Sequence, residues 1–226
     1  MDQKYLDQQS QHWETSFLNK PEMFGLEPSL AAVKALRSFQ EENIKSIVEF
    51  GAGLGRDTIF FAKNSINVQA LDYSKASIES ITNKSKKLNL ANVIKTKVFD
   101  VRKTLPFESN SIEACFSHML YCMALSNANL EYLNNEICRI LKPGGINIYT
   151  VRHTGDGDYK NGIHRGEDLY ENDGFIVSQP SGYIFFASSF VTLGTIITFS
   201  PGFQSAGVAI LCFAVRCIES IVLNIS

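Results

Sequence analysis

The feature of this sequence that most restricts its fold is a short glycine-rich turn. An apolar run at residues 47–50 is followed by glycine at three alternate positions, Gly51, Gly53 and Gly55. Helical spacing of apolar residues resumes at 59–62, so the pattern predicts a strand, a tight turn and a helix. Glycine tolerates the positive φ of such a turn and, because it lacks a Cβ, lets a ligand approach the main chain. We therefore expect a binding site at this turn.

The glycine spacing and the neighbouring charges indicate which ligand binds there. A dinucleotide fingerprint has the pattern G-x-G-x-x-G and rests a pyrophosphate on the helix N-terminus, whereas this turn has the pattern G-x-G-x-G. Asp57 falls in the first helical turn, where its charge would repel a pyrophosphate. Glu49, near the end of the strand, suits a ligand with a cationic amino-acid portion. The pattern therefore favours S-adenosylmethionine over a nicotinamide dinucleotide.

Two motifs carry a resemblance to a known family. The segment E-F-G-A-G-L-G-R-D-T at 49–58 resembles the first motif of class I S-adenosylmethionine-dependent methyltransferases, and more closely that of the small single-domain members whose helix opens Gly-Arg-Asp. The segment R-I-L-K-P-G-G at 139–145 is similar to a second, structural motif of the same family. The resemblance covers about residues 10–177. It implies a three-layer α/β/α Rossmann-like fold with a mainly parallel sheet, and S-adenosylmethionine as the cofactor.

Candidate cofactor-binding residues follow at the ends of the predicted strands. Asp72 ends a strand at 68–72, about 20 residues beyond the glycine turn, which is where an acid binds a ribose in such sites; the alternative is a helix cap. Asp100 and Val101 end the next strand, and the resemblance implies that they meet adenine, with a turn-capping aspartate as the alternative. The full set is Glu49, Gly51, Ala52, Gly53, Gly55, Asp72, Tyr73, Asp100, Val101 and Ser117.

His118 is the main candidate for a catalytic residue. It ends a strand predicted at 112–118, so it reaches the edge where open α/β sheets bind ligands, as do Ser117 and Tyr121. Imidazole titrates near neutrality and could deprotonate the methyl acceptor. A soft nucleophile attacking a sulfonium methyl needs only positioning and desolvation. A general base, a contact without proton transfer and a structural histidine therefore all stay open for His118.

Other substrate-binding candidates come from two further segments. The stretch 152–168 is polar, glycine-rich and too long for a plain turn, and long ordered loops at this edge are usually functional. Its spacing matches no standard metal-ligand pattern, so we expect no metal site. In the N-terminal segment, the resemblance implies that an aromatic residue closes the cofactor cleft, with capping of the core edge as the alternative. The candidates are Trp13, Tyr121, Arg152, His153, Tyr159 and His164.

The resemblance implies the first two of three parts of the chain, and a change in composition marks the third. We expect an N-terminal lid at 1–28, an S-adenosylmethionine-binding domain at 29–180 that begins with a helix capped by Ser29, and an apolar C-terminal segment at 181–226. That last segment contains only two charged residues, Arg216 and Glu219. Three explanations stay open for it: a hairpin that closes the sheet, a membrane hairpin within 183–223, and a non-native tail such as a frameshifted end that leaves the sheet edge unpaired.

Charge and cysteine content restrict the partners. The net charge of -2 and the pI near 6.1 show no basic footprint for nucleic acid. Five cysteines without a C-x-x-C pair indicate reduced thiols, and a polar N-terminus indicates no signal peptide, so we expect a cytoplasmic protein.

The expected function is methyl transfer from S-adenosylmethionine to an unidentified small molecule. The alternative is a non-catalytic cofactor-binding protein that its atypical C-terminus impairs or tethers to a membrane. The oligomeric state stays open.

Overall fold

The computed structural model of the protein describes residues 3–152, 159–172, 175–178 and 210–216. The helices are α1 (Gln3–Asn19), α2 (Leu30–Glu41), α3 (Arg56–Lys63), α4 (Lys75–Lys87) and α5 (Asn127–Ile140), with a 3-10 turn η1 (Leu120–Cys122). The strands are β1 (Ser46–Phe50), β2 (Asn67–Asp72), β3 (Ile94–Val98), β4 (Ile112–Ser117), β5 (Leu141–Arg152), β6 (Ile163–Gly166), β7 (Leu169–Asn172), β8 (Phe175–Ser178) and β9 (Ile210–Arg216).

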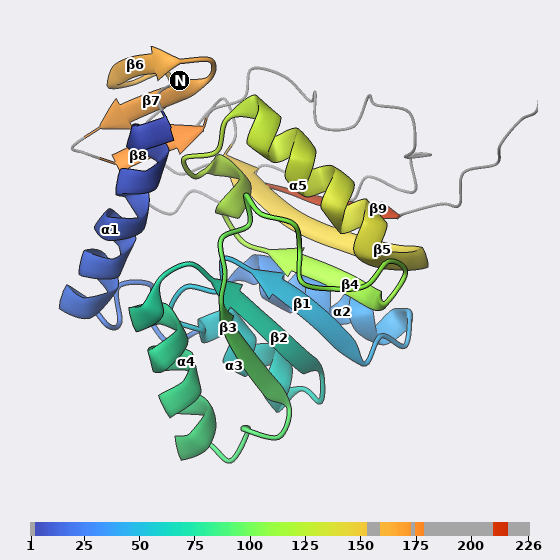
Figure 1. The fold of residues 1–226 in the computed structure, drawn as a ribbon. Coiled ribbons are helices and arrows are strands. Elements are labelled where there is room, and N and C mark those ends of the chain that lie inside the picture. The colour runs from blue at the N-terminus through green and yellow to red at the C-terminus, as the bar shows by residue number, and fades with distance from the viewer. Residues whose placement is uncertain (1–2, 153–158, 173–174, 179–209, 217–226) are drawn as a thin grey trace, which may run out of the picture.

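The central sheet has six strands in the order β3-β2-β1-β4-β5-β9 (Figure 1). β1 pairs in parallel with both β2 and β4, so that Val48 lies opposite Gln69 on one side and Cys115 on the other. β3 and β5 continue the parallel pairing, and β9 runs antiparallel to β5. The strand order reverses between β1 and β4, and open α/β sheets bind ligands in the crevice at such a point. The expected mainly parallel sheet is confirmed, and the glycine turn follows the strand at the reversal.

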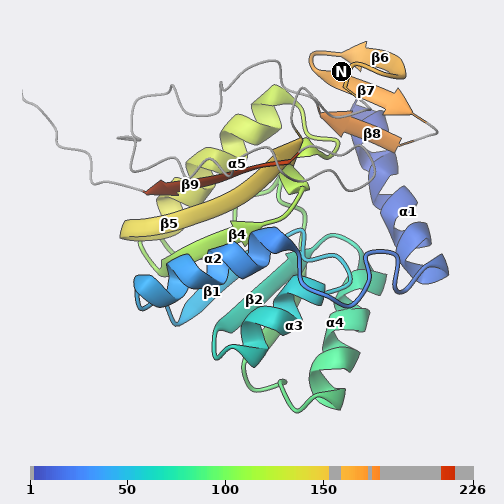
Figure 2. The same cartoon turned by 180° about the vertical axis from the view of Figure 1, so that it is seen from behind.

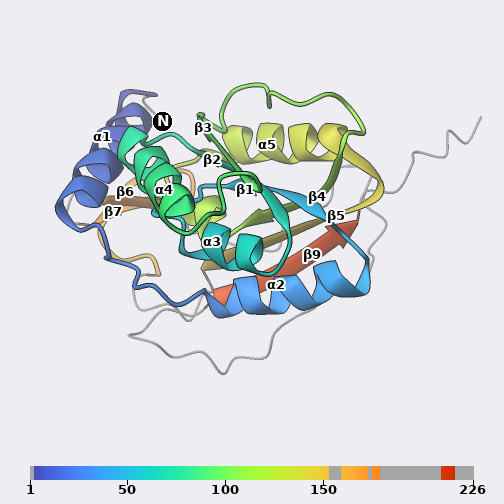
Figure 3. The ribbon, with the colours of Figure 1, turned by 90° about the horizontal axis from the view of Figure 1, so that it is seen from below.

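Helices cover both faces of this sheet, which gives three layers (Figure 3). Alternate residues of each strand point to opposite faces. On one face, Phe116 and Ile148 pack with apolar residues of α2, α3 and α4 in one buried cluster. On the other face, Cys115 and Tyr149 pack with the apolar residues of α5. Both faces of the sheet are buried because each is covered by a helix with an apolar stripe.

Serine hydroxyls begin three of the helices. The side chains of Ser29, Ser74 and Ser126 accept hydrogen bonds from the main-chain nitrogens of Ala32, Ser77 and Asn129, and so cap α2, α4 and α5. The predicted cap at Ser29 is confirmed. Ser74 caps α4. The alternative role for Asp72, as the cap of this helix, is therefore wrong.

A small second sheet lies beside α1 at one end of the molecule (Figure 2). It is antiparallel, with the order β6-β7-β8, and β8 contacts α1. By resemblance to the methyltransferase family, residues 175–177 would begin a sixth strand of the main sheet, but here they belong to the second sheet. Phe175 pairs with Asn172 instead, because β7 precedes it directly in the chain and offers a local hairpin partner. The stretch 152–168 is likewise no plain loop, since part of it forms β6.

The C-terminal segment is described only at β9. This strand pairs with β5 along seven residues, from Ile146 opposite Arg216 to Arg152 opposite Ile210. For residues 210–216, this pairing agrees with the expectation of a strand that closes the sheet edge. The rest of 181–226 lies outside the described residues. Among the described helices, none is both long enough and apolar enough to cross a membrane.

Candidate active site

A cavity of about 280 Å³ opens where the carboxyl ends of β1, β2, β4 and β5 meet α1 and β8. Its walls combine glycine, acidic and aromatic residues from segments that are far apart in the sequence. The lining residues are Trp13, Phe17, Phe24, Gly25, Glu49, Gly51, Ala52, Gly53, Leu54, Arg56, Asp57, Asp72, Tyr73, His118, Met119, Leu120, Met123, Arg152 and Phe175. Six of the ten predicted cofactor-binding residues line the cavity, and all six come from the ends of β1 and β2: Glu49, Gly51, Ala52, Gly53, Asp72 and Tyr73.

The glycine turn is held in place by the end of β2. The main-chain nitrogens of Gly51 and Ala52 donate to the carbonyl oxygen of Leu71, at 2.8 and 3.1 Å. The nitrogen of Gly53 donates to Oδ2 of Asp72 at 2.8 Å. Gly51 and Gly53 have φ of +67° and +53°, the left-handed region that favours glycine. The main chain of the turn therefore lines the cavity. The carboxylate of Asp72, which supports the turn, lines the same cavity.

Two buried acids give the cavity its electrostatic character. Glu49 accepts a hydrogen bond from Oγ1 of Thr58 at 2.5 Å, and burial together with the nearby charge of Asp57 raises its pKa well above the usual value. Burial raises the pKa of Asp72 to about 6, against the opposing effect of hydrogen bonds from Ser74 and Gly53. Burial disfavours the charged form of both carboxyl groups. A ligand with a cationic or hydroxyl group beside them would stabilise that charged form. This donor set fits S-adenosylmethionine, which carries both kinds of group.

Aromatic side chains from α1 and the segments around it cover the cavity. The ring of Trp13 lies 5.3 Å from that of Phe17 and 5.4 Å from that of Phe175, centroid to centroid. Phe24 lies 6.1 Å from Phe17, edge to face. Stacked and edge-to-face rings at these distances attract one another and exclude water. Trp13 is thus placed at the cavity, as expected of a residue that closes the cleft.

Polar contacts tie α1 to the main domain and to the second sheet. The carboxylate of Glu14 accepts from Oγ of Ser74 at 2.7 Å and from the nitrogen of Ala76 at 3.2 Å, at the start of α4. Oε1 of Gln9 accepts from the nitrogen of Ile176 in β8 at 3.1 Å. An acid at a helix N-terminus is stabilised by the unpaired amides there. The cover of the cavity is therefore anchored on both sides.

His118 lines the cavity just after the end of β4. Its Nδ1 lies 3.0 Å from Oγ1 of Thr150 on the neighbouring strand. Burial lowers the pKa of His118 to about 4, so the imidazole is neutral at pH 7. The next residue, Met119, has a φ of +65° and begins η1. A neutral ring held by one nitrogen can contact an acceptor molecule, but it is a weak base near neutral pH.

The structure places Asp100, Val101 and Ser117 outside the residues that line this cavity. Burial alone would raise the pKa of Asp100, but hydrogen bonds from Arg102 outweigh that effect and hold the pKa below its usual value. Arg102 also forms an ion pair with Asp7 of α1 at 2.9 Å. Val101 and Ser117 are buried. Gly55 also lies behind the cavity wall, where it packs against Ile81 of α4.

Tyr121 belongs to the core, and its expected contact with substrate is wrong. Its side chain is fully buried and stacks on Tyr149 at a centroid distance of 4.3 Å. Its hydroxyl donates to Oδ1 of Asn134 at 3.1 Å and accepts from Nδ2 of Asn147 at 3.2 Å. The 3-10 turn η1 directs the side chain under α5 rather than toward the cavity. A strand end located from the sequence cannot show the direction in which the following turn points.

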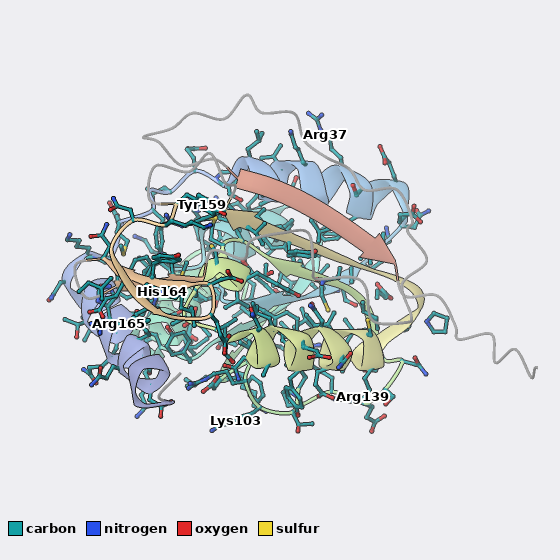
Figure 4. All side chains as sticks on the ribbon, turned by 90° about the horizontal axis from the view of Figure 1, so that it is seen from above. Arg37, Lys103, Arg139, Tyr159, His164 and Arg165 are labelled. Atoms are coloured by element: carbon teal, nitrogen blue, oxygen red, sulfur yellow. The ribbon has the colours of Figure 1, made fainter. Side chains whose placement is uncertain are left out.

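The candidates from the segment 152–168 separate in space. Arg152 lines the cavity, and His153 lies outside the described residues. Tyr159 and His164 lie at the end of the molecule that holds the second sheet (Figure 4), and neither lines the cavity. His164 instead bonds the carbonyl oxygen of Glu167 at 2.8 Å and lies beside Tyr170, 5.0 Å between ring centroids. Of the three that the structure describes, Arg152 alone lines the cavity.

Three of the residues that sequence reasoning missed at the site have a clear structural role there. Phe175 comes from β8, Thr150 supports His118 from β5, and Asp57 lines the cavity while it accepts hydrogen bonds from the nitrogen and hydroxyl of Ser29, both at 2.7 Å. Thr150 lies two residues before Arg152, so both side chains point to the same face of the strand. This spacing could have indicated that Thr150 lies near the site. Nothing in the sequence pattern points to Phe175, because its position depends on how the second sheet packs on α1.

Comparison with known proteins agrees with this geometry. Residues 47–145 match the family described as a methyltransferase domain, a span that runs from the first strand of the site to the glycines before β5. A phosphoethanolamine N-methyltransferase 1 of Triticum aestivum is 34% identical over 130 residues, which is 56% of this chain and 22% of that protein. One of the same description from Zea mays is 35% identical over 133 residues, 56% of this chain and 25% of that protein. The chain thus spans about a quarter of the length of these relatives.

Solved structures share the fold at low sequence identity. The Burkholderia thailandensis 1,6-didemethyltoxoflavin-N1-methyltransferase, crystallised with its 1,6-didemethyltoxoflavin and S-adenosylhomocysteine, has a TM-score of 0.73 at 15% identity, over 97% of this chain and 91% of that one. The cyclase SpnF has a TM-score of 0.53 at 18% identity, over 65% and 60%. At such identities the likeness concerns the fold alone. Residues 47–145, somewhat less than half of the chain, therefore resemble a methyltransferase domain, and the fold around them is the one that these solved structures share.

Proposed function

We propose that this protein transfers a methyl group from S-adenosylmethionine to a small-molecule acceptor. The observation that carries the proposal is the junction of β1 and β2, where Asp72 both supports the glycine turn through Gly53 and lines the same cavity as Glu49. Two buried acids with raised pKa beside the main chain of the glycine turn form a site for a ligand that is cationic at one end and carries hydroxyls at the other.

Within this proposal each part of the cofactor has its own residues. Glu49 and the turn at 51–55 hold the methionine portion, and Asp72 beside Tyr73 accepts hydrogen bonds from the ribose hydroxyls. Asp100 and Val101 follow β3 at the same edge of the sheet, and we assign them to adenine. When bound, the cofactor supplies an electrophilic methyl group on a sulfonium.

The acceptor side of the cavity is the wall formed by Trp13, His118 and Arg152. Residues 1–28 act as a lid, in which Trp13 packs on Phe175 and keeps water from the reacting atoms. Direct displacement from a sulfonium needs alignment and desolvation of the acceptor more than proton transfer. The neutral His118 therefore contacts the acceptor, and the aromatic cover desolvates it.

The relatives suggest where to begin a search for the acceptor. The matched proteins from Triticum aestivum and Zea mays are named for phosphoethanolamine, so small amines and their phosphate esters form the first panel to screen. A cavity of about 280 Å³ suits a small molecule better than a macromolecular substrate.

Calorimetric titration with S-adenosylmethionine tests the proposal. We expect micromolar binding by the wild-type chain, about -8 kcal/mol, and its loss in Asp72→Ala. The matched control is Glu108→Gln, which also removes one negative charge but lies on the exposed loop before β4, at the opposite edge of the sheet. Mass spectrometry of S-adenosylhomocysteine formed with the acceptor panel then tests turnover. A folded chain that binds no cofactor, or binds equally after Asp72→Ala, would refute the proposal.

A further inference from the structure

The hydroxyl of Thr150 makes two hydrogen bonds behind the cavity wall. The main-chain nitrogen of Met119 lies 2.8 Å from Oγ1, and Nδ1 of His118 lies 3.0 Å from it. The side chain of Thr150 is fully buried, so water does not reach the hydroxyl. Among the described residues, Met119 and His118 are the two partners of this hydroxyl.

The direction of the second bond follows from counting protons. The amide of Met119 is a donor, so Oγ1 accepts in that bond and its own proton remains to be donated. A buried hydroxyl proton requires an acceptor, and Nδ1 of His118 is the acceptor within reach. Thr150 therefore donates to Nδ1, which means that Nδ1 carries no proton.

The charge state of the ring completes the assignment. Burial lowers the pKa of His118 to about 4, so at pH 7 the ring is neutral and holds one proton. With Nδ1 unprotonated, that proton is on Nε2, the nitrogen on the other side of the ring from Thr150. His118 lines the cavity, whereas Thr150 does not.

We propose that Thr150 is a positioning residue that holds His118 as its Nε2–H tautomer, so that the ring offers the cavity a hydrogen-bond donor and not a base. The main-chain nitrogen of Met119 donates to the same oxygen and so fixes the position of the hydroxyl. The same bond supports Met119, a non-glycine residue at a φ of +65°. One hydroxyl thereby orients both the ring and the turn that follows β4.

The Nε2–H of His118 restricts which methyl-accepting substrates fit the cavity. This consequence rests on the proposed function. The group against Nε2 must accept a hydrogen bond, as a carbonyl, carboxylate or phosphoryl oxygen does. An alkylammonium group has only hydrogen-bond donors, so neither it nor the Nε2–H of His118 would find an acceptor in the other. The substrate therefore has an oxygen acceptor close to the atom that receives the methyl group.

Nitrogen NMR of the histidine rings tests the tautomer directly. The wild-type chain is labelled with 15N-histidine, and the His118 signals are those that disappear in His118→Asn. Expected at neutral pH are a protonated Nε2 and an unprotonated Nδ1 that receives a hydrogen bond, in the wild type and in Thr150→Ser, which keeps the hydroxyl. In Thr150→Val the Nδ1 resonance moves to the position of a nitrogen without a donor.

Two results would overturn the proposal: a protonated Nδ1 in the wild type, or an Nδ1 resonance that Thr150→Val leaves unchanged. If Thr150→Val does not fold, the wild type and Thr150→Ser still decide between the tautomers. The spectra require neither cofactor nor turnover. A chain that fails to bind S-adenosylmethionine but shows the Nε2–H ring would therefore refute only the proposed function.

Discussion

The main-chain nitrogen of Gly53 lies 2.8 Å from Oδ2 of Asp72, so the acid at the end of β2 holds the glycine turn at the end of β1. The other carboxylate oxygen accepts from the nitrogen of Ser74 at 2.9 Å, just before α4. One side chain therefore joins two strand ends and a helix start at the rim of the cavity. Any change in its charge is transmitted to the main chain that faces the ligand.

This arrangement predicts that cofactor affinity depends on pH. Burial raises the pKa of Asp72 to about 6, and burial also raises that of Glu49. Below about pH 6 the carboxyl of Asp72 holds a proton that ribose binding must expel, so affinity falls as pH decreases, by up to about tenfold per pH unit from this group. Calorimetry between about pH 5 and pH 8 measures this.

The matched variant for the pH series is Asp72→Asn. It keeps the shape of the side chain but cannot titrate, so we expect weaker binding with a shallower pH dependence, the remainder arising from Glu49. Wild-type affinity that stays constant through pH 6 would contradict the assignment of Asp72 to the ligand.

Two glycines with the same backbone conformation should respond differently to alanine. Gly55 and Gly144 have φ of +82° and +79°, but a Cβ on Gly55 would lie 2.5 Å from Cγ1 of Ile81, whereas Gly144 has open space. We expect Gly144→Ala to lower the free energy of unfolding by about 1 to 2 kcal/mol through backbone strain. Gly55→Ala should lower it by a further 1 to 3 kcal/mol, approximately, through overpacking. Urea denaturation of both variants measures the difference, and equal losses would argue against close packing of Gly55 on α4.

Removing the carboxylate of Glu14 should loosen the cover of the cavity. In Glu14→Ala the hydroxyl of Ser74 and the nitrogen of Ala76 lose their acceptor on α1, at a cost of about 1 kcal/mol. We expect faster amide hydrogen exchange in α1 and a shift in the fluorescence of Trp13, the single tryptophan of the chain. The control is Gln11→Ala, at an exposed position on the same helix. Equal exchange in the two variants would show that Glu14 does not anchor α1.

The assignment of Tyr121 to the core predicts an effect on stability alone. Tyr121→Phe leaves Asn134 and Asn147 without the hydroxyl that they contact, so we expect a loss of about 1 to 3 kcal/mol in unfolding free energy. Cofactor affinity and the choice of acceptor should not change. The control is Tyr132→Phe, at an exposed tyrosine on α5, with an expected effect within about 0.5 kcal/mol. Altered acceptor preference in Tyr121→Phe, at unchanged stability, would restore Tyr121 as a substrate residue.

Local sequence determined the elements that depend on near neighbours. The glycine turn at 51–55, the strand that ends in Asp72 and the helix that begins at Ser29 were all predicted, because turn chemistry, hydrophobic period and capping act over a few residues. The parallel sheet followed from the resemblance, and with it the meeting of the β1 and β2 ends. These features were enough to indicate the cofactor.

Only the tertiary structure decided which side chains face the cavity. Tyr121 points under α5 because η1 turns it away from the strand end, and Phe175 reaches the cavity because β8 pairs with β7 and packs on α1. The bond between Thr150 and His118 joins residues 32 positions apart on neighbouring strands. Side-chain direction after a turn and contacts between distant segments depend on packing across the whole domain, which the spacing of residues along a chain does not encode.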